Sequence, residues 1–181
     1  MVGRFTSGIL VLVMLSLASC SVVSSPFKGL WIAKPEFREV DNALCSVRIA
    51  PQKGNNSYYA FFQLTIVNRS DDALMLDWNE SRYLLDGKPQ GVLVFEGIDP
   101  EAVKSGAVPL ETIPPGGRLE RNLMPMRLIA WNPIKENTAA SRGITPGMLP
   151  AGENGIRLSL RHANSRVTIP LSVLLSREAS E

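Results

Sequence analysis

From residue 44 onward, apolar residues recur at every second position, and the stretches with this alternation are separated by Gly, Pro, Asn and Asp. Residues 44–49 alternate in this way, and residues 58–68 are the densest stretch in aromatic and β-branched side chains. Because successive side chains of a strand point to opposite faces, this period indicates strands with one buried and one exposed face. The sequence therefore predicts an antiparallel β protein.

Turn residues join the predicted strands. Residues 86–87, Asp-Gly, have the composition of a tight hairpin turn, with residues 91–95 as its return strand. We expect further turns at residues 154–155, which are Asn-Gly, and at residues 163–165. The other predicted strands are residues 73–78, 82–85, 118–123, 156–161 and 167–175, and residues 126–131 are a weaker candidate.

One short helix is expected near residues 99–105. Asp99 suits the N-cap, Pro100 suits the first turn, and Glu101 faces the positive end of the helix dipole. The helix is expected to end near Gly106. Residues 112–117 contain two Pro and two Gly, and we expect this rigid turn to carry the chain from one sheet to the other.

About seven strands with one short helix favour an antiparallel β-sandwich over residues 37–176, and the closing pair of alternating strands suits an Ig-like layout. In the spacing of its predicted strands and turns, the chain resembles the broad class of Ig-like sandwiches. This class includes domains of periplasmic lipoproteins with no assigned activity. A transthyretin-like sandwich or a small barrel has nearly the same pattern. Residues 177–181 are expected to be a solvated tail.

The first twenty residues have the layout of an export signal. Arg4 is followed by an apolar run at residues 9–17 and then by small residues. A helix that spans a bilayer needs about 20 apolar residues, so this run is too short for a permanent anchor. The alternative is a short buried helix of the folded domain. We expect residues 1–19 to be a signal peptide and residues 20–36 to be a tether.

Leu17-Ala18-Ser19-Cys20 resembles the lipobox of bacterial lipoproteins, which consists of an apolar residue, two small residues and an obligatory Cys. The resemblance implies that diacylglycerol is attached to the Cys20 sulfur, that the chain is cut before Cys20, and that the new amino terminus is acylated, for example by palmitate. Ser21 stands where an Asp often marks inner-membrane retention, which implies the outer membrane, facing the periplasm, if the organism is Gram-negative. The alternative is an ordinary signal peptide with an incidental Cys20.

The sequence offers few groups for catalysis. His162 is the only histidine, and no Gly-x-Ser-x-Gly segment accompanies it. Four acidic residues lie within residues 71–80, but they lack the spacing of a calcium-binding loop. Cys45 is expected to be a buried, inert thiol, the alternative being a bridge to another chain. We therefore expect no enzyme activity, no cofactor and no metal site. The acidic residues are Asp71, Asp72, Asp77 and Glu80.

Two pairs of neighbouring residues are candidates for ligand binding, because an aromatic ring beside an amide is able to stack on a sugar ring or to anchor a protein partner. A tryptophan of a sandwich is more often part of the core. Trp31 is likewise expected to pack in the core, the alternative being a position at the membrane interface. The candidate pairs are Trp78 with Asn79 and Trp131 with Asn132.

Charge and composition exclude a nucleic-acid partner, because 19 Lys and Arg against 17 Asp and Glu form no basic stripe. Three functional hypotheses follow. The first is a lipoprotein, held in the membrane by lipid on Cys20, whose non-catalytic sandwich binds or braces another component of the cell envelope. The second is a glycan or small-ligand binding module that uses Trp78 or Trp131. The third, less favoured, is a hydrolase that uses His162 or the acids near Asp71.

Overall fold

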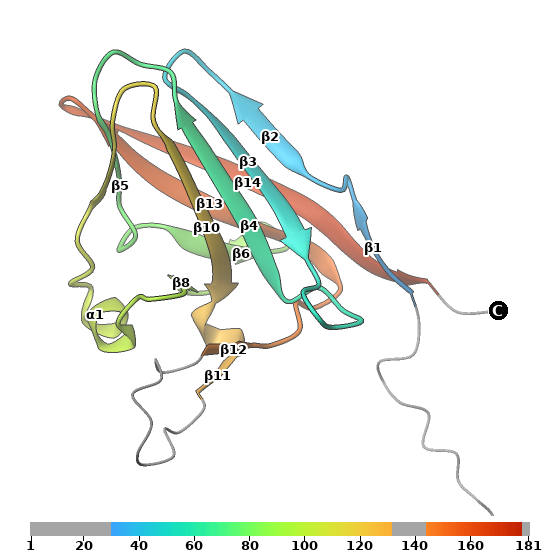
Figure 1. Ribbon diagram of the computed structural model, residues 1–181. Coiled ribbons are helices and arrows are strands. Elements are labelled where there is room, and N and C mark those ends of the chain that lie inside the picture. The colour runs from blue at the N-terminus through green and yellow to red at the C-terminus, as the bar shows by residue number, and fades with distance from the viewer. Residues whose placement is uncertain (1–29, 132–143, 179–181) are drawn as a thin grey trace, which may run out of the picture.

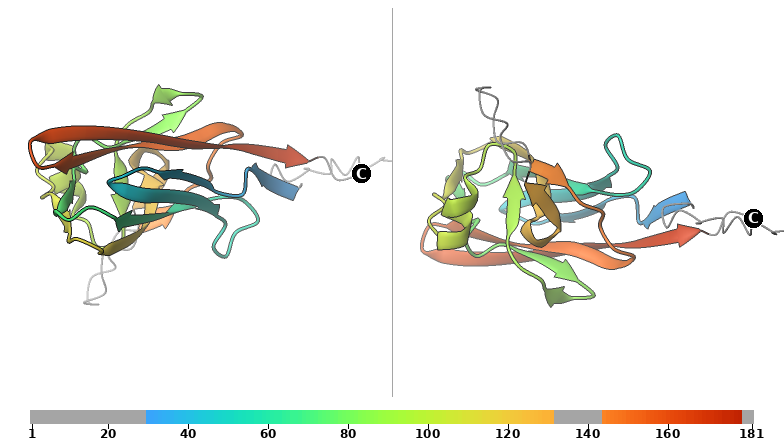
Figure 2. Two further views of the ribbon diagram at one scale, coloured as in Figure 1. Left: turned by 90° about the horizontal axis from the view of Figure 1, so that it is seen from above. Right: turned by 90° about the horizontal axis from the view of Figure 1, so that it is seen from below.

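The computed structural model describes residues 30–131 and 144–178, and they form two antiparallel sheets packed face to face (Figure 1). The views along the layers show the sheets edge-on (Figure 2). The larger sheet has the order β1-β14-β13-β5-β9, with β6 on β13 and β7 on β6. The smaller sheet has the order β2-β3-β4-β10-β8. The predicted antiparallel β-sandwich is confirmed.

The larger sheet contains β1 (Leu30–Lys34), β5 (Leu74–Leu76), β6 (Arg82–Leu85), β7 (Lys88–Pro89), β9 (Glu111–Ile113), β13 (Gly152–His162) and β14 (Ser165–Glu178). The smaller sheet contains β2 (Arg38–Asp41), β3 (Cys45–Gln52), β4 (Phe61–Asn68), β8 (Leu93–Phe95) and β10 (Arg118–Pro125). Outside the two sheets lie α1 (Pro100–Ser105), the 3-10 turn η1 (Met126–Leu128), and the small ladder of β11 (Ile129–Trp131) and β12 (Ile144–Pro146).

The core lies between the inward faces of the two sheets and follows the period-two pattern. On β3, Val47 and Ile49 are buried, and they stand opposite Ile66 and Leu64 of β4. The facing residues of the larger sheet alternate in the same way along β13 and β14. Trp31 of β1 also joins this core, as expected. From β13 and β14, the core takes Ile156, Leu158, Leu160, Ile169, Leu171, Val173 and Leu175.

Local turn chemistry is confirmed at several points. Asp99 accepts a hydrogen bond from the Glu101 amide at 3.0 Å and caps α1, which ends at Gly106 with a φ of 68°. The turn after β9 carries the chain from the larger sheet to β10 of the smaller sheet, as predicted for residues 112–117. Ala163, with a φ of 49°, turns the chain between β13 and β14.

The hairpin at residues 86–87 is confirmed, but its predicted return strand is wrong. Asp86 and Gly87 have φ values of 50° and 72°, and β7 pairs with β6 directly after them. Gly91, with a φ of 119°, then ends this excursion, and β8 pairs with β10 in the smaller sheet instead. The apolar run at residues 91–95 therefore indicated a strand without indicating its sheet.

The prediction of a turn at Asn154-Gly155 is also wrong, because both residues lie inside β13. Asn154 is buried, and its amide donates to the carbonyls of Pro150 and Gly152 while its Oδ1 accepts from the Tyr83 hydroxyl. A Cβ at position 155 would approach the Leu171 carbonyl oxygen of β14 to 2.3 Å. Gly155 thus permits close strand approach rather than a turn.

The folded domain is larger than residues 37–176. β1 pairs with the end of β14, so residues 30–34 belong to the sandwich rather than to the tether. β14 extends to Glu178, so Arg177 and Glu178 are strand residues rather than a solvated tail. Short strands at the sheet edges raise the number above the predicted seven. Residues 1–19 and Cys20 lie outside the described residues, and within the described part of the chain no helix is long and apolar enough to cross a membrane.

Asn68, at the end of β4, ties the two sheets together where the chain crosses between them. Its side chain is buried, and its Nδ2 donates to the carbonyls of Asp72, Ile113 and Pro114 at 2.8–3.1 Å. Its Oδ1 accepts from the Ser70 amide at 2.9 Å. One side chain therefore links the end of β4 to the turn before β5 and to the corner after β9.

We expect Asn68→Ala to lower the free energy of unfolding by about 3 kcal/mol, because the substitution removes the hydrogen bonds from Asn68 to three carbonyls and the acceptor of the Ser70 amide. Urea denaturation measures this change. Asn122→Ala is the matched control, since Asn122 is exposed on β10, and it is expected to cost less than about 0.5 kcal/mol. Equal urea midpoints for the two variants would contradict this role of Asn68.

Candidate functional site

Trp78, the first candidate for ligand binding, is a core residue. It lies two residues after the end of β5, and only 3% of its surface is exposed. Its Nε1 donates to Glu111 Oε2 of β9 at 2.9 Å, and its ring centroid lies 4.7 Å from that of Phe95. The indole N–H is thereby satisfied and the ring is covered, so Trp78 offers no exposed face on which a sugar ring could stack.

Asn79 is likewise engaged inside the protein. Its Nδ2 donates to the Val108 carbonyl at 2.7 Å, and its Oδ1 accepts from the Val108 amide at 3.1 Å. The side chain thus mimics a strand partner and holds the segment between α1 and β9 against the end of β5. The backbone of Trp131 pairs with Ile144, and Asn132 lies outside the described residues, so this second pair stays a prediction.

The structure brings His162 close to one of the candidate acids. His162 Nε2 lies 3.6 Å from Asp72 Oδ2 and has no hydrogen-bond partner among the described residues. Asp77 is buried and ion-paired with Arg161, while Glu80 lies 3.9 Å from Arg166. Within residues 30–131 and 144–178, no three or more His, Cys, Asp or Glu side chains gather as metal ligands do.

Cys45 is a buried free thiol, which confirms the favoured interpretation. Burial raises the pKa of the Cys45 thiol, although the Arg69 charge and a hydrogen bond from Asn42 oppose this rise. Because the thiolate is the nucleophilic form, a raised pKa makes this sulfur less reactive.

The outer face of the smaller sheet carries a shallow polar groove that the sequence analysis did not single out. It has a volume of about 330 Å³ and runs across β2, β3, β4 and β10. Its residues are the outward half of the period-two pattern, which nothing in the sequence distinguishes from an ordinary solvent face. This surface, called the sheet groove below, is lined by Glu39, Ser46, Arg48, Ala50, Gln52, Gln63, Thr65, Val67, Arg118 and Glu120.

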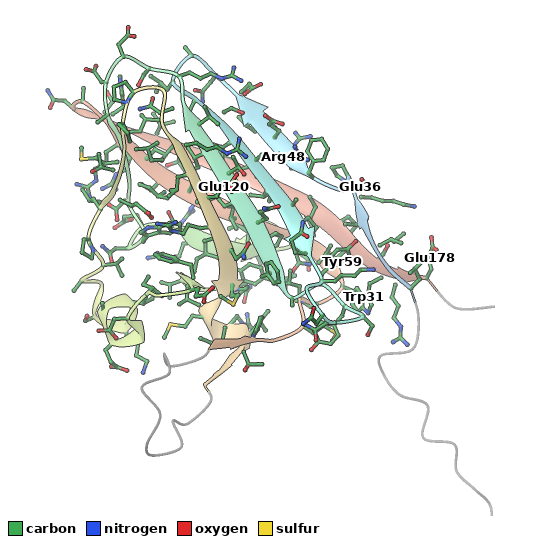
Figure 3. The ribbon with its side chains drawn as sticks, in the orientation of Figure 1. Trp31, Glu36, Arg48, Tyr59, Glu120 and Glu178 are labelled. Atoms are coloured by element: carbon green, nitrogen blue, oxygen red, sulfur yellow. The ribbon has the colours of Figure 1, made fainter. Side chains whose placement is uncertain are left out.

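One row of paired residues crosses the floor of the sheet groove. Glu39 stands opposite Arg48, Arg48 opposite Thr65, and Thr65 opposite Glu120. Figure 3 labels Arg48 and Glu120 on the smaller sheet. The row therefore consists of a carboxylate, a guanidinium, a hydroxyl and a second carboxylate on four neighbouring strands. It offers both donors and acceptors of hydrogen bonds.

The charges of the sheet groove are largely balanced within it. Glu120 forms an ion pair with Arg118, and Glu39 accepts from the Ser46 hydroxyl at 2.7 Å. The Arg48 guanidinium carbon lies 3.7 Å from the centroid of the Phe37 ring. The Gln63 and Thr65 side chains form no hydrogen bond within the described part of the chain. The sheet groove is thus suited to bind a polar surface of low net charge by hydrogen bonds.

The candidate residues therefore separate into three places. Trp78 and Asn79 hold the core and a loop, His162 and Asp72 meet at the turn end of β13, and the sheet groove lies on the outer face of the smaller sheet. No family model, no curated protein and no solved structure matches the chain significantly. The chemistry of these surfaces is the basis for a functional proposal.

We expect Trp78→Ala to lower the free energy of unfolding by about 4 kcal/mol, because a buried ring is replaced by a cavity and Glu111 loses its donor. Phe37→Ala is the control, since Phe37 is 42% exposed, and it is expected to cost less than about 1 kcal/mol. Thermal or urea unfolding followed by circular dichroism measures both. A Trp78→Ala protein as stable as the parent chain would remove Trp78 from the core.

Proposed function

We propose that this protein is a lipid-anchored lipoprotein of the cell envelope whose non-catalytic sandwich binds or braces another envelope component. The observation that carries the proposal is the sequence Leu17-Ala18-Ser19-Cys20 after an apolar run that is too short to span a bilayer. The sheet groove is the proposed contact surface. Its hydrogen-bonding groups and balanced charges suit a polar surface of another macromolecule.

The anchor follows from the energetics of acyl chains. Each buried methylene contributes about 0.8 kcal/mol, and a single chain gives only reversible attachment. Diacylglycerol on Cys20 together with an acylated amino terminus supplies more than one chain, which holds a folded domain at a membrane. Ser21 favours the outer membrane, facing the periplasm, if the organism is Gram-negative.

The side-chain arrangement supports binding over catalysis. The acids of the sheet groove are engaged with Arg118 and with the Ser46 hydroxyl, and the single histidine of the chain, His162, lies on β13 of the other sheet. His162 and Asp72 lie near one another, but Ser70, a neighbour of Asp72 in sequence, has its hydroxyl within bonding distance of Asn68 Oδ1 and of the Asp72 carbonyl. We therefore propose no reaction for this pair.

Glycan binding is the second candidate function, and the sheet groove favours it over the residues first considered. The Gln63 amide and the Thr65 hydroxyl line an open surface, and both match the hydroxyl groups of a neutral sugar. The buried ring of Trp78 gives no such surface. Binding of oligomers of N-acetylglucosamine, measured by calorimetry, distinguishes this function from the bracing of a protein partner.

We expect Cys20→Ser to move the protein from the membrane fraction to the soluble fraction while the domain stays folded. The reason is that serine lacks the sulfur to which the diacylglycerol is attached, whereas the described core does not depend on Cys20. Cell fractionation with immunoblotting measures the location, and Cys45→Ser is the matched control that retains the anchor. A Cys20→Ser protein that stays in the membrane fraction after a high-salt wash would contradict the proposed anchor.

We expect Thr65→Lys to reduce recovery of the envelope partner by about tenfold, because a long charged side chain on the floor of the sheet groove blocks close contact. The control is Thr168→Lys, which places the same side chain on the exposed outer face of β14 in the other sheet. Crosslinking in intact cells followed by quantitative mass spectrometry measures recovery. Loss of the partner with Thr168→Lys but not with Thr65→Lys would place the contact on the opposite face.

A further inference from the structure

Two of the three large hydrophobic side chains that the described residues expose lie on β1 and on β14, the strand that pairs with it. Leu30 is 60% exposed and Leu174 is 48% exposed, whereas the third, Phe37, packs on Arg48, a residue of the sheet groove. Scattered exposed leucines need no explanation, but their concentration beside one strand does. Leu30 is the first described residue, and it is therefore the described residue that is nearest in sequence to Cys20.

Strand register places Leu30, Ile32 and Leu174 on the same outer face. Leu30 and Ile32 alternate with the buried Trp31, so they point away from the core. Leu174 stands opposite Lys34, two positions beyond Ile32, and is therefore the diagonal neighbour of Ile32. Ile32 is half-buried but is not among the residues that pack against the core. These three residues form a continuous strip, called the β1 strip below.

The β1 strip lies on the outer face of the larger sheet, whereas the sheet groove lies on the outer face of the smaller sheet. The start of β1 and the end of β14 run side by side at one end of the molecule (Figure 1). Trp31 and Glu178 are labelled at that end in Figure 3. A surface that contacts the β1 strip therefore leaves the sheet groove open on the other side.

We propose that the β1 strip rests on the lipid bilayer and orients the domain, so that the sheet groove faces away from the membrane. This inference rests on the proposed lipid anchor. Leu30 lies ten positions after Cys20, and ten residues extend at most about 36 Å, so an anchored Cys20 keeps the strip close to the bilayer. A contact too small to bind alone becomes effective when a tether raises its local concentration.

The charges around the β1 strip point to apolar contact rather than to attraction by anionic lipids. Lys34 stands opposite Leu174, but Glu178 stands opposite Leu30, and Glu153 stands on the other side of Leu174. The strip therefore has no excess of basic residues, so contact is expected even with zwitterionic phosphatidylcholine and at high salt.

A second copy of the chain is the competing occupant, because β1 is an edge strand. Lys53 partly covers that edge, since its Nζ donates to the Trp31 carbonyl at 2.9 Å. A carbonyl that is already bonded to a lysine is less able to pair with an added strand. This observation favours the bilayer, which contacts the side chains and does not need the backbone edge.

The test uses the full lipidated chain in phosphatidylcholine vesicles, with a polarity-sensitive fluorophore attached to Leu174→Cys. Gln63→Cys, in the sheet groove, is the matched control. Cys45 is buried and does not compete for the label. We expect a blue-shifted emission at position 174, with quenching by a lipid-borne quencher at least about threefold stronger than at position 63. High salt should leave this difference unchanged.

Equal quenching at positions 174 and 63 in protein that sediments with the vesicles would overturn the β1 strip contact and leave the lipid anchor intact. A blue shift at position 174 that persists in detergent micelles, together with a dimer in light scattering, would assign the strip to a second copy and overturn the bilayer proposal. Protein that does not sediment with the vesicles would overturn both this inference and the proposed anchor.

Discussion

Face-to-face packing of two sheets, each with one apolar side, is the constraint on which the rest of this structure depends. The hairpin of β3 and β4 and the hairpin of β13 and β14 supply nearly half of the buried core side chains. Since the side-chain period is two, every residue that this packing fixes inward fixes its neighbours outward. The sheet groove and the β1 strip are therefore both consequences of the core, on opposite outer faces of the sandwich.

Three asparagine side chains, of which Asn68 and Asn154 are buried and Asn79 is half-buried, complete this packing near the ends of strands. Asn68 bonds the carbonyls of the corner between the sheets, Asn79 bonds the segment after α1, and Asn154 bonds Tyr83 and the chain before β13. Each side chain supplies donors and an acceptor to neighbouring backbone or side-chain groups. Burial also raises the pKa of Tyr83 to about 12, so its hydroxyl stays neutral and donates at any ordinary pH.

The alternation of apolar residues at every second position and the residue types of turns are local properties of the sequence. The features that they determine were predictable from the sequence. These include the inward side of β3, the cap of α1 at Asp99 and the crossing between sheets at residues 112–117. The assignment of residues 91–95 to a sheet failed because strand pairing depends on distant residues. The prediction of a turn at Asn154-Gly155 is wrong because the sequence does not distinguish the two uses of glycine. A glycine that lets two strands approach closely and a glycine that forms a turn are the same residue.

The candidate site shows the same limit, because the exposure of Trp78 is set by Glu111 and Phe95, which lie far away in sequence. The sheet groove appears only when the four strands β2, β3, β4 and β10 lie side by side. We propose that a lipid on Cys20 holds this sandwich at a membrane, and intact mass spectrometry of the native protein tests this anchor. We expect a chain that begins at Cys20 and carries diacylglycerol. A chain that begins elsewhere, or an unmodified Cys20, would contradict it.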